Sequence, residues 1–540
     1  MQVHISIILG LLPTALARIT VDPGPKYPPT NGEIWPQPRF QLKQDKYYVL
    51  DPSHFKIKIT EHSCDIMMAA IDRYDFTMHI YTNLTRRYRR RNLNPEPWSD
   101  FKYQGLIREL NIILKNPCEE YPNADMDEAY NLKVGTTSFL KSASIWGIIR
   151  GLESFSHLFY LAPDFNQIRI NGTEITDYPR YAHRGILLDT SRHYFSMDTI
   201  LKTLDAMSMN KLNVFHWHIV DDQSFPYESA KLPDLSRRGA FHPSMVYTKR
   251  DVDTVITYAR DRGIRVVPEF DVPGHTRSWG AAYPNILTEC YDNQQNFVGL
   301  GPMNPLKNST YKLLRNLLAE VEERFPERYL HVGGDEVQLS CWQSNPAVRA
   351  YMQANNLTPT LLHGMFMEKV LDMLSSKSQA IVWQELFDEG ITLSPDTLVQ
   401  VWKHDWVNKM KMILQSGYKL LFSSEWYLDI LDQTFIKMLS VDPRQAVIDD
   451  THDEALAKGI VGGEACMWGE MADDTNVISR MWPRASAVAE RLWSPLPATL
   501  TGHRKQVPNE ALHRIEEHVC RMNRRGIAAE PATGPGFCVT

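Results

Sequence analysis

The chain has 540 residues, of which 43% are hydrophobic and 23% are charged, and its formal net charge is −6. This composition is ordinary for a globular protein with a sizeable core, and the mild negative charge argues against a nucleic-acid-binding or membrane-surface protein. The length allows about two to four domains, although one large barrel could use most of it.

The first 17 residues have the pattern of a secretory signal peptide. An apolar run extends from Ile5 to Leu12, and Ala15 and Ala17 form a small-x-small cleavage site. A buried strand or helix is the alternative, because His4 is the only basic side chain before the run. No other stretch reaches the roughly 18 apolar residues that a membrane span needs. We therefore predict the secretory pathway, with a lysosomal or extracellular destination and no transmembrane segment.

The seven cysteines and four sequons suit an oxidising, secretory compartment. Six cysteines allow many pairings. Pairing in sequence order gives Cys64–Cys118, Cys290–Cys341 and Cys520–Cys538, and leaves Cys466 free in an apolar segment. The candidate glycosylation sites are Asn83, Asn171, Asn308 and Asn356.

Residues 18–180 are predicted to form a small α/β domain. A proline-rich start is followed by strand-like segments such as HFKIKI and AYNLKV, and by the helical stretch SIWGIIRGLESFSHLF. The basic run RRYRRR at 86–91 is either a protease-sensitive loop or a solvated loop, and we favour the solvated loop.

Residues 181–540 are predicted to form a (β/α)8 barrel that ends in a terminal helix and a tail. Eight apolar, β-branched runs alternate with amphipathic helical stretches, as expected for parallel strands buried on both faces. The predicted strands are 184–190, 212–220, 264–270, 329–334, 380–386, 398–403, 418–424 and 460–468. An open doubly wound sheet would alternate similarly, but neither GxGxxG nor a P-loop follows a strand, and we predict no cofactor.

Charged, polar or aromatic residues occur at or just after the end of every predicted strand. In a barrel these ends meet at one face and build the ligand site. The set includes three tryptophans, whose faces pack on sugar rings, together with carboxylates and an arginine that can bind hydroxyls. Its members include Arg192, Asp221, His275, Asp335, Glu336, Trp383, Trp402, Tyr427, Asp429, Trp468 and Glu470. The sequence therefore predicts a carbohydrate site.

The segment HVGGDEV at 331–337 places two adjacent acids after two glycines. Asp335 and Glu336 are too close in sequence to flank a glycosidic bond as the usual retaining pair, whose carboxyls lie about 5–5.5 Å apart on opposing faces of the ring. A different arrangement suits them: Glu336 protonates the leaving oxygen, and Asp335 holds a substrate group that itself attacks. An exposed acidic turn is the alternative. His216 and His218 could suggest zinc, but spacing on one buried strand favours core histidines, so we predict no metal.

Several motifs together resemble glycoside hydrolase family 20, and within it the lysosomal-type β-N-acetylhexosaminidases of the β-subunit kind. They are HRGILLDTSRHY, KLNVFHWHIVDDQSFPYES, PEFDVPGHT, HVGGDEV, VWQE and GGEACMWGE. The resemblance covers about 181–495 and, weakly, the N-terminal region, and it agrees with the cysteine pairing above. It implies substrate-assisted retaining hydrolysis of terminal β-linked GlcNAc or GalNAc, and a homodimer.

The resemblance also implies a role for each candidate residue. Glu336 corresponds to the general acid/base and Asp335 to the residue that orients the acetamido group, with Tyr427 on the acetamido carbonyl. Trp383, Trp402 and Trp468 would wall the sugar pocket, Arg192 and Glu470 would bind its hydroxyls, and Asp221 and His275 would support Glu336. Asp429 followed by Ile430 resembles the subunit type that acts on neutral sugars, because a carboxylate there repels a 6-sulfate.

Two other functions stay open at the level of sequence. A secreted carbohydrate-binding protein with an inactive site would need no turnover, although the acid pair and the tryptophans all stand in place. A conventional two-carboxylate β-glycosidase would cleave plain β-glucosides, which lack an acetamido group.

Overall fold

The computed structural model describes residues 30–88, 101–163, 166–501, 506–533 and 538. The predicted signal peptide at 1–17 lies outside the described residues, as do residues 89–91 of the basic run. No helix in the described ranges is long and apolar enough to span a membrane.

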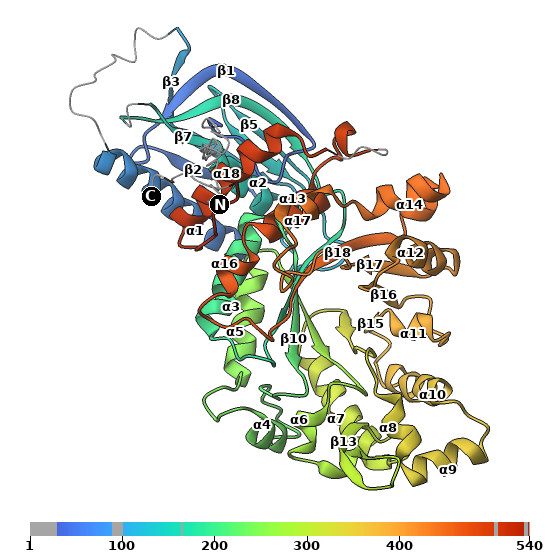
Figure 1. The fold of residues 1–540 in the computed structure, drawn as a ribbon. Helices are drawn as coiled ribbons and strands as arrows, with labels where there is room; N and C mark the ends of the chain where they lie inside the picture. Colours follow the sequence, from blue (N-terminus) through green and yellow to red (C-terminus); the bar gives the residue numbers. More distant parts are fainter. Residues whose placement is uncertain (1–29, 89–100, 164–165, 502–505, 534–537, 539–540) are drawn as a thin grey trace, which may run out of the picture.

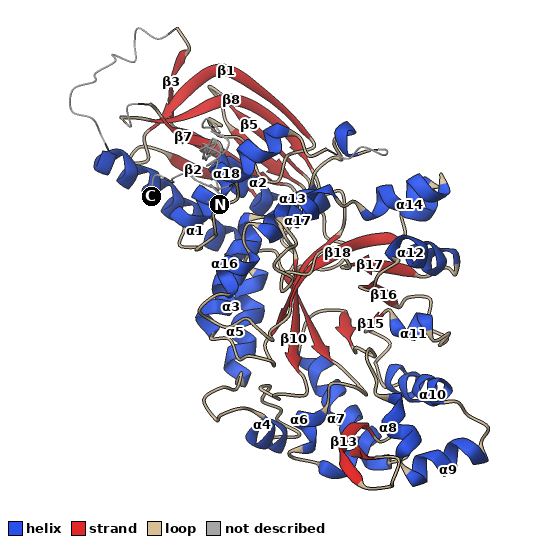
Figure 2. Cartoon of the chain, viewed as in Figure 1, coloured by secondary structure: helices blue, strands red, loops and turns tan. Residues whose placement is uncertain are grey.

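Eight parallel strands close into a barrel, with helices around its outside (Figures 1 and 2). The strands, in their order around the barrel, are β9 His183–Asp189, β10 Val214–Val220, β11 Arg265–Phe270, β14 Tyr329–His331, β15 Gln379–Trp383, β16 Leu398–Val401, β17 Lys419–Phe422 and β18 Ile460–Met467. Each of the eight predicted runs overlaps one of these strands, so the predicted (β/α)8 fold is confirmed.

Several of the strands end one or two residues before the predicted end, and β14 and β15 end three residues before it, which backbone conformation explains. β14 stops at His331 because Gly333 and Gly334 have φ of +69° and +97°, values that a strand cannot accommodate. β15 stops at Trp383 because the chain turns at once into the short helix α11, Glu385–Asp388. Both early ends free the backbone to form loops at the barrel mouth.

The barrel helices lie between and after the strands in chain order. A β-hairpin that the sequence did not predict lies between β11 and β14 in the chain. The helices are α3 Met197–Met209, α4 Asp234–Gly239, α5 Lys249–Arg260, α6 Arg277–Gly280, α7 Asn308–Arg324, α8 Leu339–Ser344, α9 Pro346–Ala354, α10 Pro359–Leu371, α12 Trp406–Gln415, α13 Phe435–Ser440, α14 Pro443–Thr451, α15 Glu454–Ala457, α16 Val477–Met481, α17 Arg484–Trp493 and α18 Asn509–Arg524. The hairpin is β12 Leu287–Tyr291 with β13 Phe297–Met303. Local signals start several helices: in α5, for example, Thr248 and Asp251 cap each other's backbone N–H groups.

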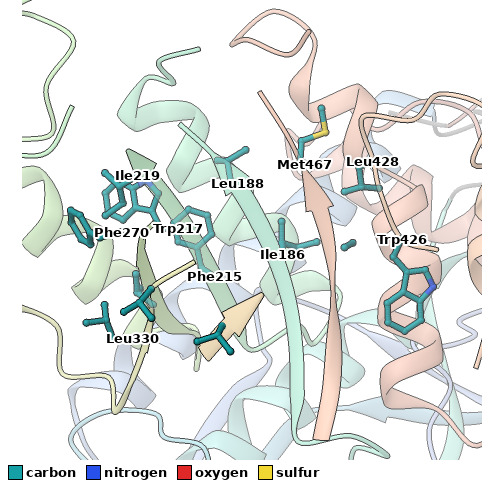
Figure 3. Packing of buried hydrophobic residues seen from close by; sticks show 14 of the residues in the cluster. Ile186, Leu188, Phe215, Trp217, Ile219, Phe270, Leu330, Trp426, Leu428 and Met467 are labelled. Atoms are coloured by element: carbon teal, nitrogen blue, oxygen red, sulfur yellow. The ribbon is translucent and has the colours of Figure 1, made fainter. Parts of the chain in front are cut away.

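Successive side chains on a barrel strand point alternately outward to the helices and inward to the barrel axis, which gives two separate apolar layers. On β9, Ile186 and Leu188 belong to the large core under the helices, together with Phe215 and Trp217 of β10 (Figure 3). The inward layer is smaller and holds Val214, Val267, Ile381, Leu398 and Leu421. Full burial of such side chains contributes roughly 1.5–3 kcal/mol each, which explains the near-continuous apolar runs in the sequence.

The N-terminal region forms a mixed sheet in the order β2-β4-β6-β5-β8-β1-β3, with β7 beside β8. Its strands are β1 Phe40–Leu50, β2 Lys56–Glu61, β3 Tyr103–Ile107, β4 Glu109–Leu114, β5 Tyr130–Val134, β6 Phe139–Ser142, β7 Phe159–Leu161 and β8 Ile168–Asp177. Helices α1 Asp65–Tyr88 and α2 Ile145–His157 share one hydrophobic core with this sheet. The predicted strands HFKIKI and AYNLKV and the predicted helix correspond to β2, β5 and α2.

Buried charges join this sheet region to the barrel. Glu128 accepts hydrogen bonds from Arg150 Nε of α2 at 2.8 Å and from Arg184 Nη2 of β9 at 2.6 Å. Lys211 Nζ lies 3.0 Å from Asp177 Oδ2, with both side chains fully buried. Because a buried charge is tolerated only when it is paired, these contacts tie the two regions together.

The three predicted disulfides are present, and Cys466 is a buried free thiol. The sequon asparagines Asn83, Asn308 and Asn356 are exposed, which is compatible with glycosylation. Asn171 is different: its amide donates to the Gln44 carbonyl at 2.7 Å and accepts from the Tyr160 hydroxyl at 2.6 Å.

Candidate active site

A cavity of about 350 Å³ opens at the carboxyl ends of the barrel strands. It brings together every side chain that the sequence proposed for the site. Its lining residues are Arg192, His218, Asp221, Asp271, His275, Asp335, Glu336, Trp383, Trp402, Tyr427, Asp429, Trp468, Glu470 and Met471. Asp271 follows the third predicted strand and was counted among the strand-end residues, but sequence reasoning assigned no role to it, to His218 or to Met471. The position of Asp271 directly after β11 was the signal that could have given it a role.

The two adjacent acids after β14 have different surroundings. Asp335 is buried, with 8% of its surface exposed, whereas the Glu336 side chain is 59% exposed at the mouth of the cavity. Glu336 has a φ of +47°, a left-handed conformation that is uncommon outside glycine and that costs roughly 1–3 kcal/mol. This turn points successive side chains in different directions, so one acid faces inward and the other faces the opening.

The glycines before the acids are required by close packing. A Cβ at Gly333 would lie 1.7 Å from Asp271 Oδ1, and one at Gly334 would lie 2.2 Å from Leu386 Cδ1. The Gly334 N–H also donates to Asp271 Oδ1 at 2.9 Å. Any larger residue at either position would therefore displace the acid pair.

His275 lies at the centre of a group of carboxylates. Its Nδ1 is 3.1 Å from Asp221 Oδ1, and its Nε2 is 3.5 Å from Asp335 Oδ2 and 3.7 Å from Glu336 Oε2. Burial opposes its charge, but Asp271 and Asp335 together hold the pKa of His275 well above its ordinary value. His275 is therefore an imidazolium.

The charge on His275 determines which neighbouring acid is ionised. Burial disfavours the Asp335 carboxylate, yet the His275 imidazolium holds the pKa of Asp335 below its ordinary value. Burial and then the charge of Asp335 raise the pKa of Asp271 well above its ordinary value. Asp335 is thus a buried carboxylate whose ionised form His275 favours, and Asp271 beside it is the less readily ionised of the two acids.

Aromatic side chains form the walls, and fixed hydrogen bonds orient them. Trp383 Nε1 donates to Glu269 Oε1 at 2.8 Å, and Trp402 Nε1 donates to Glu385 Oε2 at 3.0 Å. The ring centroids of Trp383 and Trp468 are 6.0 Å apart, and those of Trp402 and Tyr427 are 6.4 Å apart and stacked. Oriented indole faces of this kind match the apolar faces of a sugar ring.

Polar groups on the other side of the cavity are only partly satisfied. Arg192 Nη1 contacts Asp189 Oδ2 at 3.1 Å and its Nη2 contacts Asp221 Oδ2 at 2.9 Å, while its Nε lies 3.9 Å from Glu470. Within the described part of the chain, Arg192 Nε, Asp335 Oδ1 and Asp429 Oδ1 are buried without a hydrogen-bond partner. Buried polar atoms are normally paired, so these atoms indicate hydrogen bonds to a ligand.

A second hollow of about 340 Å³ adjoins the cavity and shares His275 and Glu336 with it. Its other lining residues are Asp222, Gly274, Thr276, Arg277, Gly301, Pro302 and Gln338. Glu336 therefore stands between two binding spaces, where an acid could reach a bond that joins one sugar to the next group.

The two histidines that suggested zinc lie within ion-pair distance of carboxylates on both ring nitrogens. His216 Nδ1 lies 2.7 Å from Glu464 Oε2 and its Nε2 lies 3.0 Å from Glu269 Oε2. His218 contacts Glu269 and Asp221 in the same way. These contacts explain both rings as parts of a buried polar network.

A parallel barrel whose mouth combines an exposed acid, a buried anion and indole walls defines a glycoside hydrolase. Comparison with known families agrees. Residues 181–496 match "Glycosyl hydrolase family 20, catalytic domain", and residues 34–158 match "beta-acetyl hexosaminidase like". The chain belongs to glycosyl hydrolase family 20.

Curated relatives and solved structures share nearly the whole length of the chain. The beta-hexosaminidase subunit beta of Felis catus is 42% identical over 517 residues, which cover 94% of this chain and 93% of that protein. The subunit alpha of Rattus norvegicus is 40% identical over 522 residues and covers 94% of each chain. The Flavobacterium johnsoniae chitobiase structure is 28% identical with a TM-score of 0.76, covering 92% of this chain and 73% of that one.

Proposed function

We propose that this enzyme is an exo-acting β-N-acetylhexosaminidase that removes terminal, non-reducing β-linked GlcNAc or GalNAc with retention of configuration. The observation that carries the proposal is the buried Asp335 anion held at 3.5 Å by His275, directly beside the exposed Glu336. A buried anion next to an acid is suited to orienting an amide N–H and to stabilising positive charge on the sugar.

The first step uses the acetamido group of the substrate as the nucleophile. Asp335 accepts a hydrogen bond from the acetamido N–H, and the Tyr427 hydroxyl donates to the acetamido carbonyl oxygen. That oxygen attacks C1 as the bond from C1 to the leaving oxygen breaks, and Glu336 transfers its proton to the leaving oxygen. Burial raises the pKa of Tyr427 well above its ordinary value, which keeps its hydroxyl protonated for this role.

The second step hydrolyses the cyclic oxazolinium ion. Its positive charge lies beside the Asp335 carboxylate, which is ionised before substrate binds and needs no rearrangement. Water attacks C1 while Glu336 takes a proton from it, the ring opens, and the acetamido group is restored. Two displacements at C1 retain the β configuration.

The two hollows support an assignment of subsites. The aromatic cavity of about 350 Å³ would hold the terminal sugar, with Arg192 and Glu470 on its hydroxyls and Trp383, Trp402 and Trp468 around it. The hollow of about 340 Å³ beyond Glu336 would hold the leaving group of a glycan, glycolipid or chitin oligomer.

Asp429 supports a preference for neutral sugars. It lines the cavity, and Ile430 after it is 43% exposed. Burial and then the nearby Glu470 raise the pKa of Asp429 to about 6. Above that pH it is an anion that repels a sulfate on the sugar.

The cellular setting and organisation are also part of the proposal. Three disulfides suit a protein that folds in the secretory pathway, with delivery to a lysosome or export. We propose a signal peptide at 1–17, an N-terminal α/β domain at 18–180 and a catalytic barrel with its helix and tail at 181–540. Glycosylation at the exposed sequons and a homodimer remain predictions.

The test compares two aryl glycosides that differ only at C2 of the sugar. The purified enzyme should cleave an aryl 2-acetamido-2-deoxy-β-glucoside at least about 1,000-fold faster than the matching aryl β-glucoside, because only the first carries an intramolecular nucleophile. Equal rates would contradict the substrate-assisted mechanism. Binding of N-acetylglucosamine without turnover of either substrate would instead favour an inactive binding protein.

A further inference from the structure

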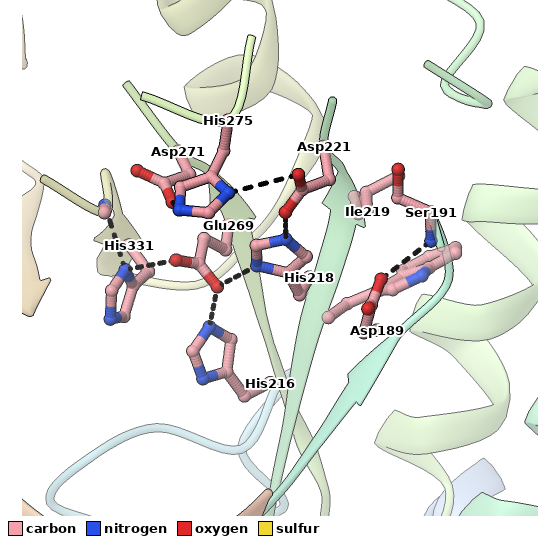
Figure 4. A network of polar contacts seen from close by, with 12 residues as sticks. Asp189, Ser191, His216, His218, Ile219, Asp221, Glu269, Asp271, His275 and His331 are labelled. Carbon is pink, nitrogen blue, oxygen red and sulfur yellow. Dashed lines mark hydrogen bonds and ion pairs between the residues drawn. The ribbon is translucent and has the colours of Figure 1, made fainter. Parts of the chain in front are cut away.

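Imidazoles and carboxylates alternate in a series of contacts that leads to the cavity, and Figure 4 shows the part of this series from His216 to His275. In order, the contacts are His183 Nε2 to Glu464 Oε1 at 2.6 Å, Glu464 Oε2 to His216 Nδ1 at 2.7 Å, His216 Nε2 to Glu269 Oε2 at 3.0 Å, Glu269 Oε2 to His218 Nδ1 at 2.5 Å, His218 Nε2 to Asp221 Oδ2 at 2.8 Å, and Asp221 Oδ1 to His275 Nδ1 at 3.1 Å. The series ends at His275, which contacts both acids of the proposed mechanism.

His218 occupies the position in this series where the buried interior meets the cavity. Its two ring nitrogens each face a carboxylate oxygen, of Glu269 on one side and of Asp221 on the other. A neutral ring has one N–H and one lone pair, so it would turn a lone pair toward one of these oxygens. Both nitrogens therefore donate, and His218 is an imidazolium held between two anions.

The surroundings of His218 support the same protonation state. The ring is 1% exposed, and it packs against Trp468 in a T-shaped arrangement with the ring centroids 5.0 Å apart. Burial opposes its charge, but Glu269 and Asp221 raise the pKa of His218 to about 10. The ring should thus stay charged throughout the pH range in which a secretory or lysosomal enzyme works.

Asp221 depends on His218 for its orientation. One of its oxygens accepts from His218 Nε2 at 2.8 Å and forms an ion pair with Arg192 Nη2 at 2.9 Å. The other oxygen faces His275 and accepts from the backbone N–H of Asp222 at 2.5 Å. His275 itself has a left-handed φ of +53°, so its backbone does not favour its position. The His275 ring that faces Asp335 and Glu336 through Nε2 is therefore held largely by Asp221, at its Nδ1.

We propose that His218 is a positioning residue for the hydrolytic reaction: by donating to Asp221 it fixes the carboxylate that holds His275 against Asp335 and Glu336. This inference rests on the proposed function. It concerns the transition state more than substrate binding, because the Asp221 carboxylate that His218 holds has its other oxygen on His275, beside Glu336. Loss of its donor should consequently lower kcat with little change in KM.

A matched pair of substitutions separates the two hydrogen bonds of His218. In His218→Gln the amide nitrogen takes the place of Nε2, so the bond to Asp221 can form and the bond to Glu269 is lost. In His218→Asn the amide nitrogen takes the place of Nδ1, so the bond to Glu269 can form and the bond to Asp221 is lost. Both variants remove the charge and leave an amide of similar polarity in the same buried space.

The expected result is a kcat for His218→Asn about 10-fold or more below that of His218→Gln, with KM for the aryl N-acetylglucosaminide within about threefold of wild type in both. One hydrogen bond to a charged group accounts for a difference of about this size. Thermal unfolding of both variants is measured in parallel. Equal kcat values, or a lower kcat for His218→Gln, would overturn the proposal, because a residue that only supports the core would not distinguish the two amides in this direction.

Glu128→Gln provides the control for loss of a buried charge. Glu128 is as buried as His218 and is likewise held by two partners of opposite charge, but Arg150 and Arg184 have no contact with the cavity. Its kcat should equal that of wild type after correction for folded protein. A similar kcat loss in Glu128→Gln and His218→Asn would assign the effect to destabilisation and overturn the proposal.

A measurement on the unaltered enzyme covers the case in which both His218 variants fail to fold. Nitrogen-15 spectra of the histidine-labelled enzyme at pH 8 should contain buried rings with both nitrogens protonated, because solvated histidines are neutral at that pH. A spectrum in which every ring is neutral would exclude an imidazolium at His218. Absence of any wild-type activity on the aryl N-acetylglucosaminide would instead contradict the proposed function, so the two failures are distinguishable.

Discussion

Two groups of buried carboxylates in this molecule differ in how many of their oxygens have hydrogen-bond partners. At the junction between the N-terminal sheet and the barrel, Glu128 accepts from Arg150, Arg184 and Asn213, with both carboxylate oxygens occupied. In the cavity at the barrel mouth, by contrast, Asp335 Oδ1 and Asp429 Oδ1 are buried without a partner in the described residues.

The difference separates structural charge from charge reserved for a ligand. In a fully paired buried ion pair, the attraction between the charges offsets the free energy of removing them from water. Removing one partner should therefore lower the free energy of unfolding. An unsatisfied carboxylate costs free energy until a substrate supplies the missing hydrogen bond, and its removal should affect turnover or selectivity. The following experiments test this division, beginning with the largest expected effect.

Glu336→Gln should leave the fold and thermal unfolding unchanged but lower kcat/KM on a disaccharide by about 100- to 10,000-fold, the range typical for loss of a general acid. The loss should be smaller on an aryl glycoside, whose leaving group needs less protonation. Steady-state kinetics on the two substrates measure this contrast. A variant as active as wild type on the disaccharide would remove Glu336 from the mechanism.

Glu128→Gln should lower the free energy of unfolding by about 3–5 kcal/mol, because Arg150 and Arg184 would keep buried charges without their carboxylate. Denaturant unfolding followed by tryptophan fluorescence measures the change. The folded enzyme should keep its kcat and KM. Changed kinetics with unchanged stability would show that the division between the two groups is wrong.

Asp429→Asn should alter pH-dependent selectivity. The raised pKa of about 6 means that Asp429 is neutral well below pH 6 and charged well above it. Discrimination against a 6-sulfated N-acetylglucosaminide should therefore increase with pH, by about tenfold across pH 6, and flatten in the variant. The ratio of kcat/KM for neutral and sulfated substrates, measured from pH 4 to 8, tests this. Identical ratios in both enzymes would exclude Asp429 as the discriminating charge.

Much of the site could be predicted because strand ends converge in a closed barrel. Trp383 ends β15 directly after its apolar residues, and Asp335 follows β14 by four residues. The hydrophobic pattern of the strands and the position at a strand end were therefore sufficient to place both side chains in the site. His218 was missed as a site residue for a physical reason. Whether a residue next to a strand end faces the cavity or the interior depends on neighbouring strands, which the sequence does not align.

By itself, the sequence determined the eight buried strands and the residues that would meet at the barrel mouth, because these depend on local hydrophobic pattern and spacing. Only the tertiary structure decided that Asp335 is buried while Glu336 faces solvent, and that His218, Asp221 and His275 contact one another in series beside the two acids. Charge states and hydrogen bonds arise from groups far apart in the chain, since His218 and Glu336 are brought together only when β10 and β14 enter one barrel.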